Sequence, residues 1–424
     1  MHKKKIIIQF NEANFDLIEK YCKKYDLSHL SKIINFPTKL ITSSEDEYSN
    51  LEPWIQWYSF YTGLSYKEHK TFHLGDCLKS NHDNFVENMS KEYDIGIFGS
   101  MNLRPSQRYK IFIPDPWTEA YSDKSISSYY VNLAIKVLVN SNARLKLSYK
   151  SILGLIILIG FPKNLKKVNI IIKILFSYIN KSRSHLASYF DYLYFSYALK
   201  RINNNNINFA LIFLNGLAHI QHHYFLSSEN VKSNNPSWYD NGEDQILKSL
   251  NIYNDLFKKL EVLDDAEIWV VTGLTQEPQE KPIIYWRFKN HMNILKEFLN
   301  LNLKVFTRMT RDFEIEYYNE EDSAILKNFL ENSYLIDENN LQYKAFTNID
   351  FSKKNRVFVT FAYDGENENI ILNWNKLKTP LKGKLDFVAI KNGKHNGSGW
   401  AFCNVNKENI PKSTSIWNLN KYIY

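Results

Sequence analysis

Five short apolar runs, separated by longer segments of helical pattern, constrain the fold of this 424-residue chain most strongly. We expect strands, in chain order, at residues 6–10, 94–100, 209–214, 267–273 and 385–390. Short apolar runs rich in β-branched residues are typical of strands that are buried on both faces. When helices connect such strands, the strands pair in parallel. We therefore predict an α/β fold with a doubly wound, mostly parallel sheet flanked by helices.

Two stretches interrupt this pattern. The first is dense in Leu, Ile, Tyr and Lys without strand boundaries, which predicts a helical insert. In the second, the pattern predicts a strand at 356–362 and a helix at 323–331, and together these predict a small α+β insert. The expected order is core 1–124, helical insert 125–204, core 205–300, α+β insert 301–384 and core 385–424.

Within the helical insert, residues 152–179 place Lys163, Lys166, Lys167 and Lys173 among long aliphatic side chains. A helical hairpin packed on the core is the favoured interpretation, and a helix lying on a membrane surface is the alternative. The longest apolar stretch, 152–161, is well short of the roughly 20 residues that a spanning helix needs. We expect a cytoplasmic protein, with peripheral contact to the inner membrane face through residues 150–180 as the alternative.

Charge and cysteine content narrow the class of partner and the compartment. The net charge of +8 is modest for this length and forms no continuous basic stripe, so nucleic acid is not an expected partner. The three cysteines are far apart and show neither metal-ligand spacing nor a disulfide framework. This pattern indicates a reducing compartment.

Polar residues concentrate where the third apolar run stops. The run 209–214 ends at Asn215, and His219, His222 and His223 follow. Open α/β sheets bind ligands beyond the carboxyl ends of their strands. If residues 219–223 are helical, the three imidazoles share one face. We predict a polar site here, which a metal ion could occupy; in the alternative, one histidine bonds a backbone carbonyl and the others lie at the surface.

The other strand ends carry polar groups as well. Asn11 and Glu12 follow the first strand, a position that suits metal ligands or phosphate contacts. The alternative is that they cap the following helix. Gln276 lies in the short segment after the fourth strand. Residues 391–399 form an expected Gly-rich loop that is either a flexible turn or a mobile loop presenting His395 to a shared site.

A further helix is expected to begin at Pro53 and to end at Gly63, because Pro favours the first helical position and Gly the C-terminal cap. Glu45, Glu47 and Glu52 crowd its start. They are either ordinary acidic bias at a helix N-terminus or carboxylates for a cation or a proton transfer.

Arginine side chains offer a second kind of site. Guanidinium groups bind oxyanions in a bidentate manner, so phosphate contact is one interpretation of these arginines. A surface ion pair is the other interpretation, and it is favoured for each residue taken alone. The candidates are Arg104, Arg108, Arg308 and Arg311.

In this order, the pieces resemble the alkaline phosphatase superfamily, and within it the type I phosphodiesterase/nucleotide pyrophosphatase group. Asn11 stands where that family has a metal-binding aspartate, and residues 53–64 with His69 resemble the block that follows the family's nucleophile. Asn215 and His219 match the central Asp-x-x-x-His pair, and His395 matches the last histidine. The resemblance covers residues 1–120, 205–300 and 385–405.

The chain also departs from the family pattern. Leu51 and Glu52 precede Pro53 where a Thr or Ser nucleophile belongs, and Ser49 is the nearest hydroxyl. Neutral Asn at two ligand positions would leave the charge of two zinc ions poorly compensated. The resemblance therefore implies one divalent metal, zinc or manganese, bound by His219 and His395, and a standard two-zinc site is not expected.

The resemblance implies an enzyme, a hydrolase or transferase for a phosphorylated or sulfated substrate. The candidate catalytic residues are Glu52, Ser49 and His222, and the candidate substrate-binding residues are Asn11, Glu12, Asn215, Gln276 and Arg308. Similarity to divergent members from bacterial surface-polysaccharide loci suggests a phosphorylated small molecule or glycan as partner. The alternative is a non-catalytic relative that binds a phosphosugar, a nucleotide or a protein.

Overall fold

The computed structural model describes residues 3–139, 148–160, 185–231, 242–263, 265–308 and 310–423, with positions 169 and 172. These residues form two compact units. The first unit contains the described residues up to Glu280 and from Asn392 onward, and the second runs from Lys281 to Lys391. Both changes of unit fall inside long strands, β7 (Thr275–Phe288) and β16 (Leu385–Asn396).

An eight-stranded sheet forms the centre of the first unit. Its order is β18 (Ser413–Ser415), β2 (Thr38–Ser43), β17 (Ser398–Cys403), β6 (Glu267–Val271), β1 (Lys5–Phe10), β5 (Phe209–Leu214), β3 (Ile95–Phe98) and β4 (Ile111–Ile113). The strands from β6 to β4 pair in parallel, whereas β17 is antiparallel to both its neighbours. The predicted fold class, a mostly parallel sheet in an α/β unit, is confirmed.

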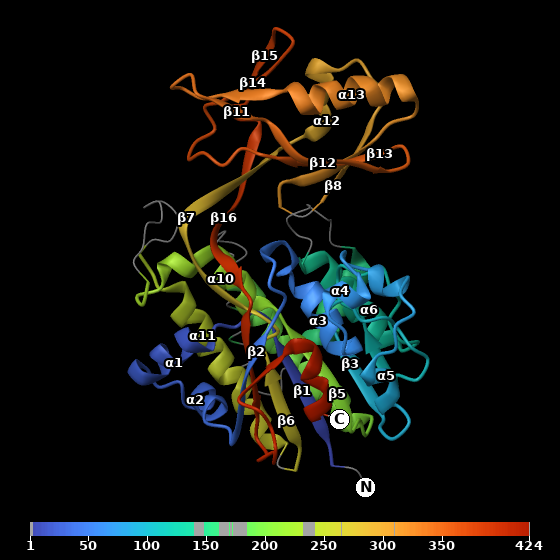
Figure 1. The fold of residues 1–424 in the computed structure, drawn as a ribbon, viewed down its shortest axis with the longest axis vertical. Coiled ribbons are helices and arrows are strands. Elements are labelled where there is room, and N and C mark those ends of the chain that lie inside the picture. Colours follow the sequence, from blue (N-terminus) through green and yellow to red (C-terminus); the bar gives the residue numbers. More distant parts are fainter. Residues whose placement is uncertain are drawn as a thin grey trace. The chain divides into compact units, whose positions relative to one another are not determined.

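Both faces of this sheet are buried, and each face has its own apolar core. The side chains of a strand alternate between the two faces, so one strand contributes to both cores. In β1, Ile6, Ile8 and Phe10 belong to one apolar core and Ile7 to the other. The first core includes α1 (Phe15–Lys24), α2 (Ser28–Ile34), α9 (Leu186–Asn204), α10 (Gly216–Tyr224) and α11 (Gln245–Phe257). The second includes α3 (Pro53–Thr62), α5 (Phe85–Met89) and α14 (Asn420–Ile423). Figure 1 shows α1, α2 and α11 on one side of the strands and α3 and α5 on the other.

The described part of the predicted helical insert is helical, with α6 (Ile126–Val139), α7 (Tyr149–Ile159) and α9. Most of residues 161–184 lie outside the described residues. Much of the segment 150–180, for which the sequence analysis gave peripheral membrane contact as an alternative, therefore lies outside them as well. Among the described helices, none combines the length and the apolar content needed to cross a bilayer.

Two expectations about the last core segment are wrong. Residues 385–390 do form a strand, but β16 pairs with β7 in a separate two-stranded sheet, and the strands that the C-terminal part of the chain adds to the central sheet are β17 and β18. Residues 391–396 continue β16 instead of forming a loop. A Cβ at Gly393 would lie 2.4 Å from the Gln276 side-chain oxygen, so this glycine permits a close backbone approach and does not mark a flexible turn.

The described residues of the second unit form two four-stranded antiparallel sheets and two helices, as expected for an α+β segment. One sheet has β11 (Gln342–Lys344), β10 (Tyr334–Ile336), β14 (Ile371–Trp374) and β15 (Leu377–Pro380). The other has β12 (Phe346–Lys353), β13 (Arg356–Phe361), β9 (Asp312–Glu316) and β8 (Lys304–Thr307). The helices are α12 (His291–Phe298) and α13 (Glu320–Asn332).

Candidate metal centre

The candidate site lies at the carboxyl edge of the central sheet. Strands β6, β1 and β5 are parallel neighbours, so their C-terminal ends meet at one edge. After β1, the Asn11 N–H donates to the Leu214 carbonyl and the Glu12 N–H to the Thr272 carbonyl, both at 3.0 Å. The chain that follows β1 is therefore held between the ends of its two neighbours.

Glu12 adopts a left-handed backbone conformation with φ of +56°. A residue with a side chain pays roughly 1 kcal/mol or more for this conformation, and such strain is found preferentially at functional sites. Two hydrogen bonds hold it: the Glu12 N–H bond to Thr272, and a bond of 2.7 Å from the Gln221 side-chain amide to the Glu12 carbonyl. The backbone thereby fixes the direction of a buried carboxylate.

Two imidazoles from distant segments meet this carboxylate. Glu12 Oε2 lies 3.0 Å from Nε2 of His222 on α10 and 3.2 Å from Nε2 of His395 on β16. The Gln276 side-chain amide donates to the same oxygen. One ligand atom from each of Glu12, His222 and His395 lies within 4.8 Å of the others.

The electrostatics of the group favour an ionised carboxylate. Burial alone would raise the pKa of Glu12, but His222 and His395 outweigh it and hold this pKa well below its usual range. Glu12 is therefore an anion at neutral pH.

One carboxylate oxygen and two imidazole nitrogens form a donor set that suits zinc or manganese. Ligands about 2.0–2.1 Å from a tetrahedral ion lie about 3.3 Å apart, and the separations from Glu12 to both histidines are close to this value. Gln276 Oε1 is also buried here without a hydrogen-bond partner in the described part of the chain. The residues present thus fit one divalent ion.

A carboxylate also lies behind one of the imidazoles. Glu52 Oε2 is 3.7 Å from Nδ1 of His395. Histidines that bind metals commonly donate their second ring N–H to a carboxylate, which fixes the tautomer and the ring orientation. Of the three glutamates at the start of α3, Glu45 instead accepts from the Tyr66 N–H and Glu47 from the Asn50 amide.

The two asparagines predicted near the site contact each other. The Asn11 side-chain nitrogen donates to Glu12 Oε1 and to Asn215 Oδ1, both at 2.8 Å, and the Trp57 indole donates to Asn11 Oδ1 at 2.7 Å. Asn11 therefore orients the Glu12 carboxylate. The pair is uncharged, so it adds no anionic ligand beside Glu12.

Two helices begin at this edge. Glu52 is the N-cap residue of α3, and Asn215 is the N-cap residue of α10. The first turn of a helix carries unpaired N–H groups and the positive end of the helix dipole, which favours anions. The Gly216 N–H at the start of α10 donates to Asp191 of α9 at 2.7 Å.

The histidine selected by the geometry differs from the expected one. His219 makes its described ring contact with His223, at 4.6 Å between centroids, while His222 contacts Glu12 and His395. Burial, with a smaller effect of His222, lowers the pKa of His219 to about 4, so this imidazole is neutral. The sequence analysis named His219 and His395 as metal ligands, whereas the donor group in the structure contains His222 and Glu12 together with His395. A ligand role for His219 stays a prediction.

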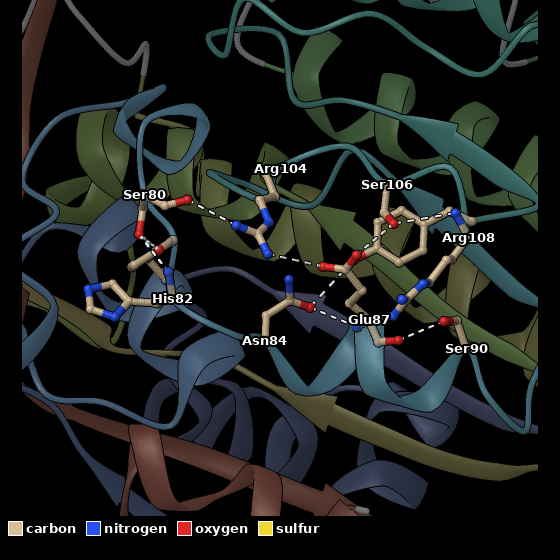
Figure 2. A network of polar contacts seen from close by, with 10 residues as sticks. Ser80, His82, Asn84, Glu87, Ser90, Arg104, Ser106 and Arg108 are labelled. Carbon is tan, nitrogen blue, oxygen red and sulfur yellow. Dashed lines mark hydrogen bonds and ion pairs between the residues drawn. The ribbon is translucent and has the colours of Figure 1, made fainter.

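The remaining predicted residues lie apart from the group of donors. Ser49 is exposed in a 3-10 turn, Tyr48–Asn50. Arg308 lies in the second unit, where it binds the buried Glu314 at 2.5 Å. Figure 2 shows Arg104 between the Ser80 carbonyl and Glu87, at 2.9 and 3.2 Å. Arg104 and Arg308 therefore form the ion pairs that were favoured for single arginines.

Gln221 and Trp57 are site residues that the sequence analysis missed. Both act through hydrogen bonds to the segment after β1, and both are buried. Gln221 precedes His222, but its residue type carries no metal or acid–base signal. Trp57 is one of nine tryptophans in an aromatic-rich chain, so composition gave no reason to select it.

Comparisons with known proteins leave the family unassigned. No protein-family model and no curated protein matches the chain. Among solved structures, it is similar to phosphonoacetate hydrolase from Sinorhizobium meliloti 1021, with 10% identity and a TM-score of 0.47 over 99% of this chain and 95% of that one.

Two further solved structures show similar values. Murine ectonucleotide pyrophosphatase/phosphodiesterase 5 gives 10% identity and a TM-score of 0.37 over 99% of this chain and 94% of that one. Wild-type alkaline phosphatase PafA gives 10% identity and a TM-score of 0.41 over 99% and 95%. Likeness at this level assigns no activity, so the proposals below depend on the residues of this chain.

Proposed function

We propose that the chain binds one divalent metal ion, zinc or manganese, through Glu12, His222 and His395, and acts on a phosphorylated substrate by hydrolysis or group transfer. The observation that carries the proposal is the convergence of these three ligand groups on one point at the carboxyl edge of a parallel sheet. Open α/β sheets bind their ligands at this edge.

The charge of the site supports an anionic substrate. With Glu12 bound as a carboxylate and both imidazoles bound in the neutral form that metal ligands take, the ligand set would carry a charge of −1, so a divalent ion would leave a net positive centre. The N-termini of α3 and α10 add favourable dipoles at the same edge. Asn11 and Asn215 supply no further negative charge, which supports a single ion.

The residues of the chain have distinct tasks in this proposal. A bound divalent ion polarises a phosphoryl oxygen and lowers the pKa of bound water. Leu51 and Glu52 directly precede Pro53, the first residue of α3, and neither has a hydroxyl group that could act as nucleophile. The proposal therefore uses water as the nucleophile. Glu52, whose carboxylate lies 3.7 Å from Nδ1 of His395, would favour the tautomer that carries its proton on Nδ1 and would leave Nε2 free to bind the ion.

The finer part of the proposal concerns the substrate. A phosphorylated small molecule or glycan, in surface-polysaccharide metabolism, is the class suggested by the sequence resemblance. Its support is that resemblance together with the anion-favouring edge described above.

Metal content tests the proposal. Protein purified from metal-replete medium is expected to contain about one zinc or manganese per chain by elemental analysis and to cleave an aryl phosphate or a phosphodiester. His222→Asn should lose the ion, whereas the matched variant His219→Asn, on the same helix, should keep it.

Two results would overturn the proposal. The first is wild-type protein that is free of metal and inactive on phosphate and sulfate esters. The second is loss of the ion from His219→Asn with full retention in His222→Asn, since this would assign the ligand role to the other imidazole.

A non-catalytic binding function is the second candidate, and a specific observation favours it. The polar groups of Asn11, Asn215, Trp57 and Glu12 form hydrogen bonds with one another, and no hydroxyl side chain stands directly before Pro53. Titration calorimetry separates the two candidates: a metal-free protein that binds a phosphosugar or nucleotide without turning it over would support the binding function.

A further inference from the structure

The helical insert has a charge balance unlike that of the rest of the chain. Between Asp123 and Asp191 the sequence contains eleven Lys or Arg residues and neither Asp nor Glu. The other 42 of the 53 basic residues are matched by all 45 acidic residues. The whole positive excess of the chain therefore belongs to this segment.

Helix α7 packs on α6 through one of its faces. Ser151, Gly154 and Leu158 are buried and recur at helical spacing. A Cβ at Gly154 would lie only 2.0 Å from the Tyr130 carbonyl oxygen of α6, so the two backbones approach closely at this glycine. This contact turns the opposite face of α7 away from α6.

The opposite face of α7 is apolar and exposed. Its residues follow the i, i+3, i+4, i+7 spacing of one helix face: Tyr149 is 76% exposed, Ile152 47%, Leu153 39% and Ile156 58%. On α6, Ile126 and Tyr129 are exposed as well. An outward helix face in water is ordinarily polar, and a contiguous apolar one marks an interaction surface.

We propose that this exposed face of α7, defined by Tyr149, Ile152, Leu153 and Ile156, binds the surface of a bilayer that contains anionic lipids. Aliphatic and tyrosine side chains would enter the headgroup region, and the positive charge of the segment would attract the surface to lipid phosphates. The 11 residues of α7 span about 16 Å, roughly half of a bilayer core, so the helix lies on the membrane.

Charge complementarity selects this occupant over a second copy of the chain. Two copies that met through this face would bring two acid-free, strongly basic segments together, and like charges repel. An anionic lipid surface attracts the positive charge of the segment and also takes up the exposed aliphatic side chains of α7.

Vesicle flotation of the full-length protein tests the proposal. We expect binding to phosphatidylcholine vesicles that contain phosphatidylglycerol, little binding to phosphatidylcholine alone, and release in about 1 M salt, where the Debye length falls to about 3 Å. Replacing Ile152, Leu153 and Ile156 together by Gln should lower vesicle affinity at least about tenfold, because three aliphatic contacts are lost.

The control variant replaces Val262 and Leu341, which are also exposed apolar residues, by Gln and should bind like the wild type. Circular dichroism confirms that each variant is folded, and Ile156→Gln alone provides a milder second variant with a smaller loss. The proposal is overturned if the wild type ignores anionic vesicles or if control and test variants lose affinity equally. Self-association that the triple variant abolishes, without vesicle binding, would also overturn it in favour of a second copy.

Discussion

At the scale of single residues, Glu12 combines two features that disfavour the folded state. Its backbone is left-handed, and its carboxylate is charged and buried. Hydrogen bonds from Gln221, Asn11 and Gln276 and the two imidazoles offset these costs. A side chain held at such cost by so many partners supports a role in function.

Glu12 and Glu52 should respond differently to the same substitution. Glu12→Gln removes a direct ligand, so we expect metal affinity to fall by on the order of a hundredfold or more. Glu52→Gln removes only the support of His395, so the fall should be about 10–100-fold. Competition with a chelator measures both. Equal affinity in Glu52→Gln and wild type, with activity lost, would instead give Glu52 a direct catalytic role.

His69 belongs to the block that resembles the superfamily, yet its contacts fix it as a neutral structural residue. Its Nδ1 accepts from the Thr71 N–H at 2.9 Å, so Nε2 carries the proton and donates to Ser59 Oγ at 2.9 Å. Burial, with a smaller effect of His82, lowers the pKa of His69 to about 4.

This lowered pKa predicts acid sensitivity. The unfolded chain takes up a proton near pH 6.5 and the folded chain only near pH 4, so the contribution of His69 is complete above pH 6.5 and is lost as pH falls. His69→Gln should therefore lose less free energy of unfolding than wild type between pH 7 and 4.5, as measured by urea titration. The exposed His73→Gln is the control, and equal slopes in wild type and His69→Gln would contradict the account.

At the scale of elements, helix α10 carries His222, and its start is tied to two other helices. Asp191 of α9 accepts from the Gly216 N–H of α10 and, at 2.5 Å, from the Tyr253 hydroxyl of α11. Burial raises the pKa of Asp191 to about 7, against the opposing effect of these hydrogen bonds. Asp191 is thus a positioning residue for α10.

The raised pKa of Asp191 predicts a pH dependence of folding stability opposite to that predicted for His69. Its proton is kept to about pH 7 in the folded state but lost near pH 4 in the unfolded chain, so wild type loses stability as pH rises between these values. The stability of Asp191→Asn relative to wild type should rise by up to roughly 4 kcal/mol from pH 4 to pH 8. Denaturation curves at several pH values measure this, and a constant difference would refute it.

Element patterns in the sequence predicted the strands around β1 and the helix that begins at Pro53, because apolar length and capping residues are local signals. The sheet membership of β16 could not be predicted in this way. Its apolar run is as strand-like as that of β5, and only long-range pairing assigns it to β7. Gly393 was misread for a related reason, since its close approach to Gln276 is a tertiary fact.

At the scale of the whole molecule, the candidate ligands lie entirely in the first unit, although they come from three distant parts of the chain. The strand-end rule predicted that residues 11–12, 215–223 and 395 would gather. It could not decide which imidazole meets Glu12, because His219, His222 and His223 lie within five residues of one helix and the sequence does not say which of their side chains faces Glu12.

The second unit has an aromatic core of its own, in which Phe361 is fully buried and lies 4.4 Å from Phe288 between ring centroids. Phe361→Ala should destabilise this unit by about 3–5 kcal/mol. Calorimetry should show one unfolding transition at lower temperature, while metal content at room temperature stays that of the wild type. Loss of the ion from this variant would contradict the assignment of the site to the first unit.

X-ray absorption spectroscopy of the purified metal-bound protein tests the central claim most directly, because it counts the imidazoles around the ion. We predict a first shell at about 2.0–2.2 Å with two imidazoles and oxygen ligands in the wild type, and one imidazole in His222→Asn. A shell without imidazole, or one that His222→Asn leaves unchanged, would contradict the claim that Glu12, His222 and His395 form a metal site.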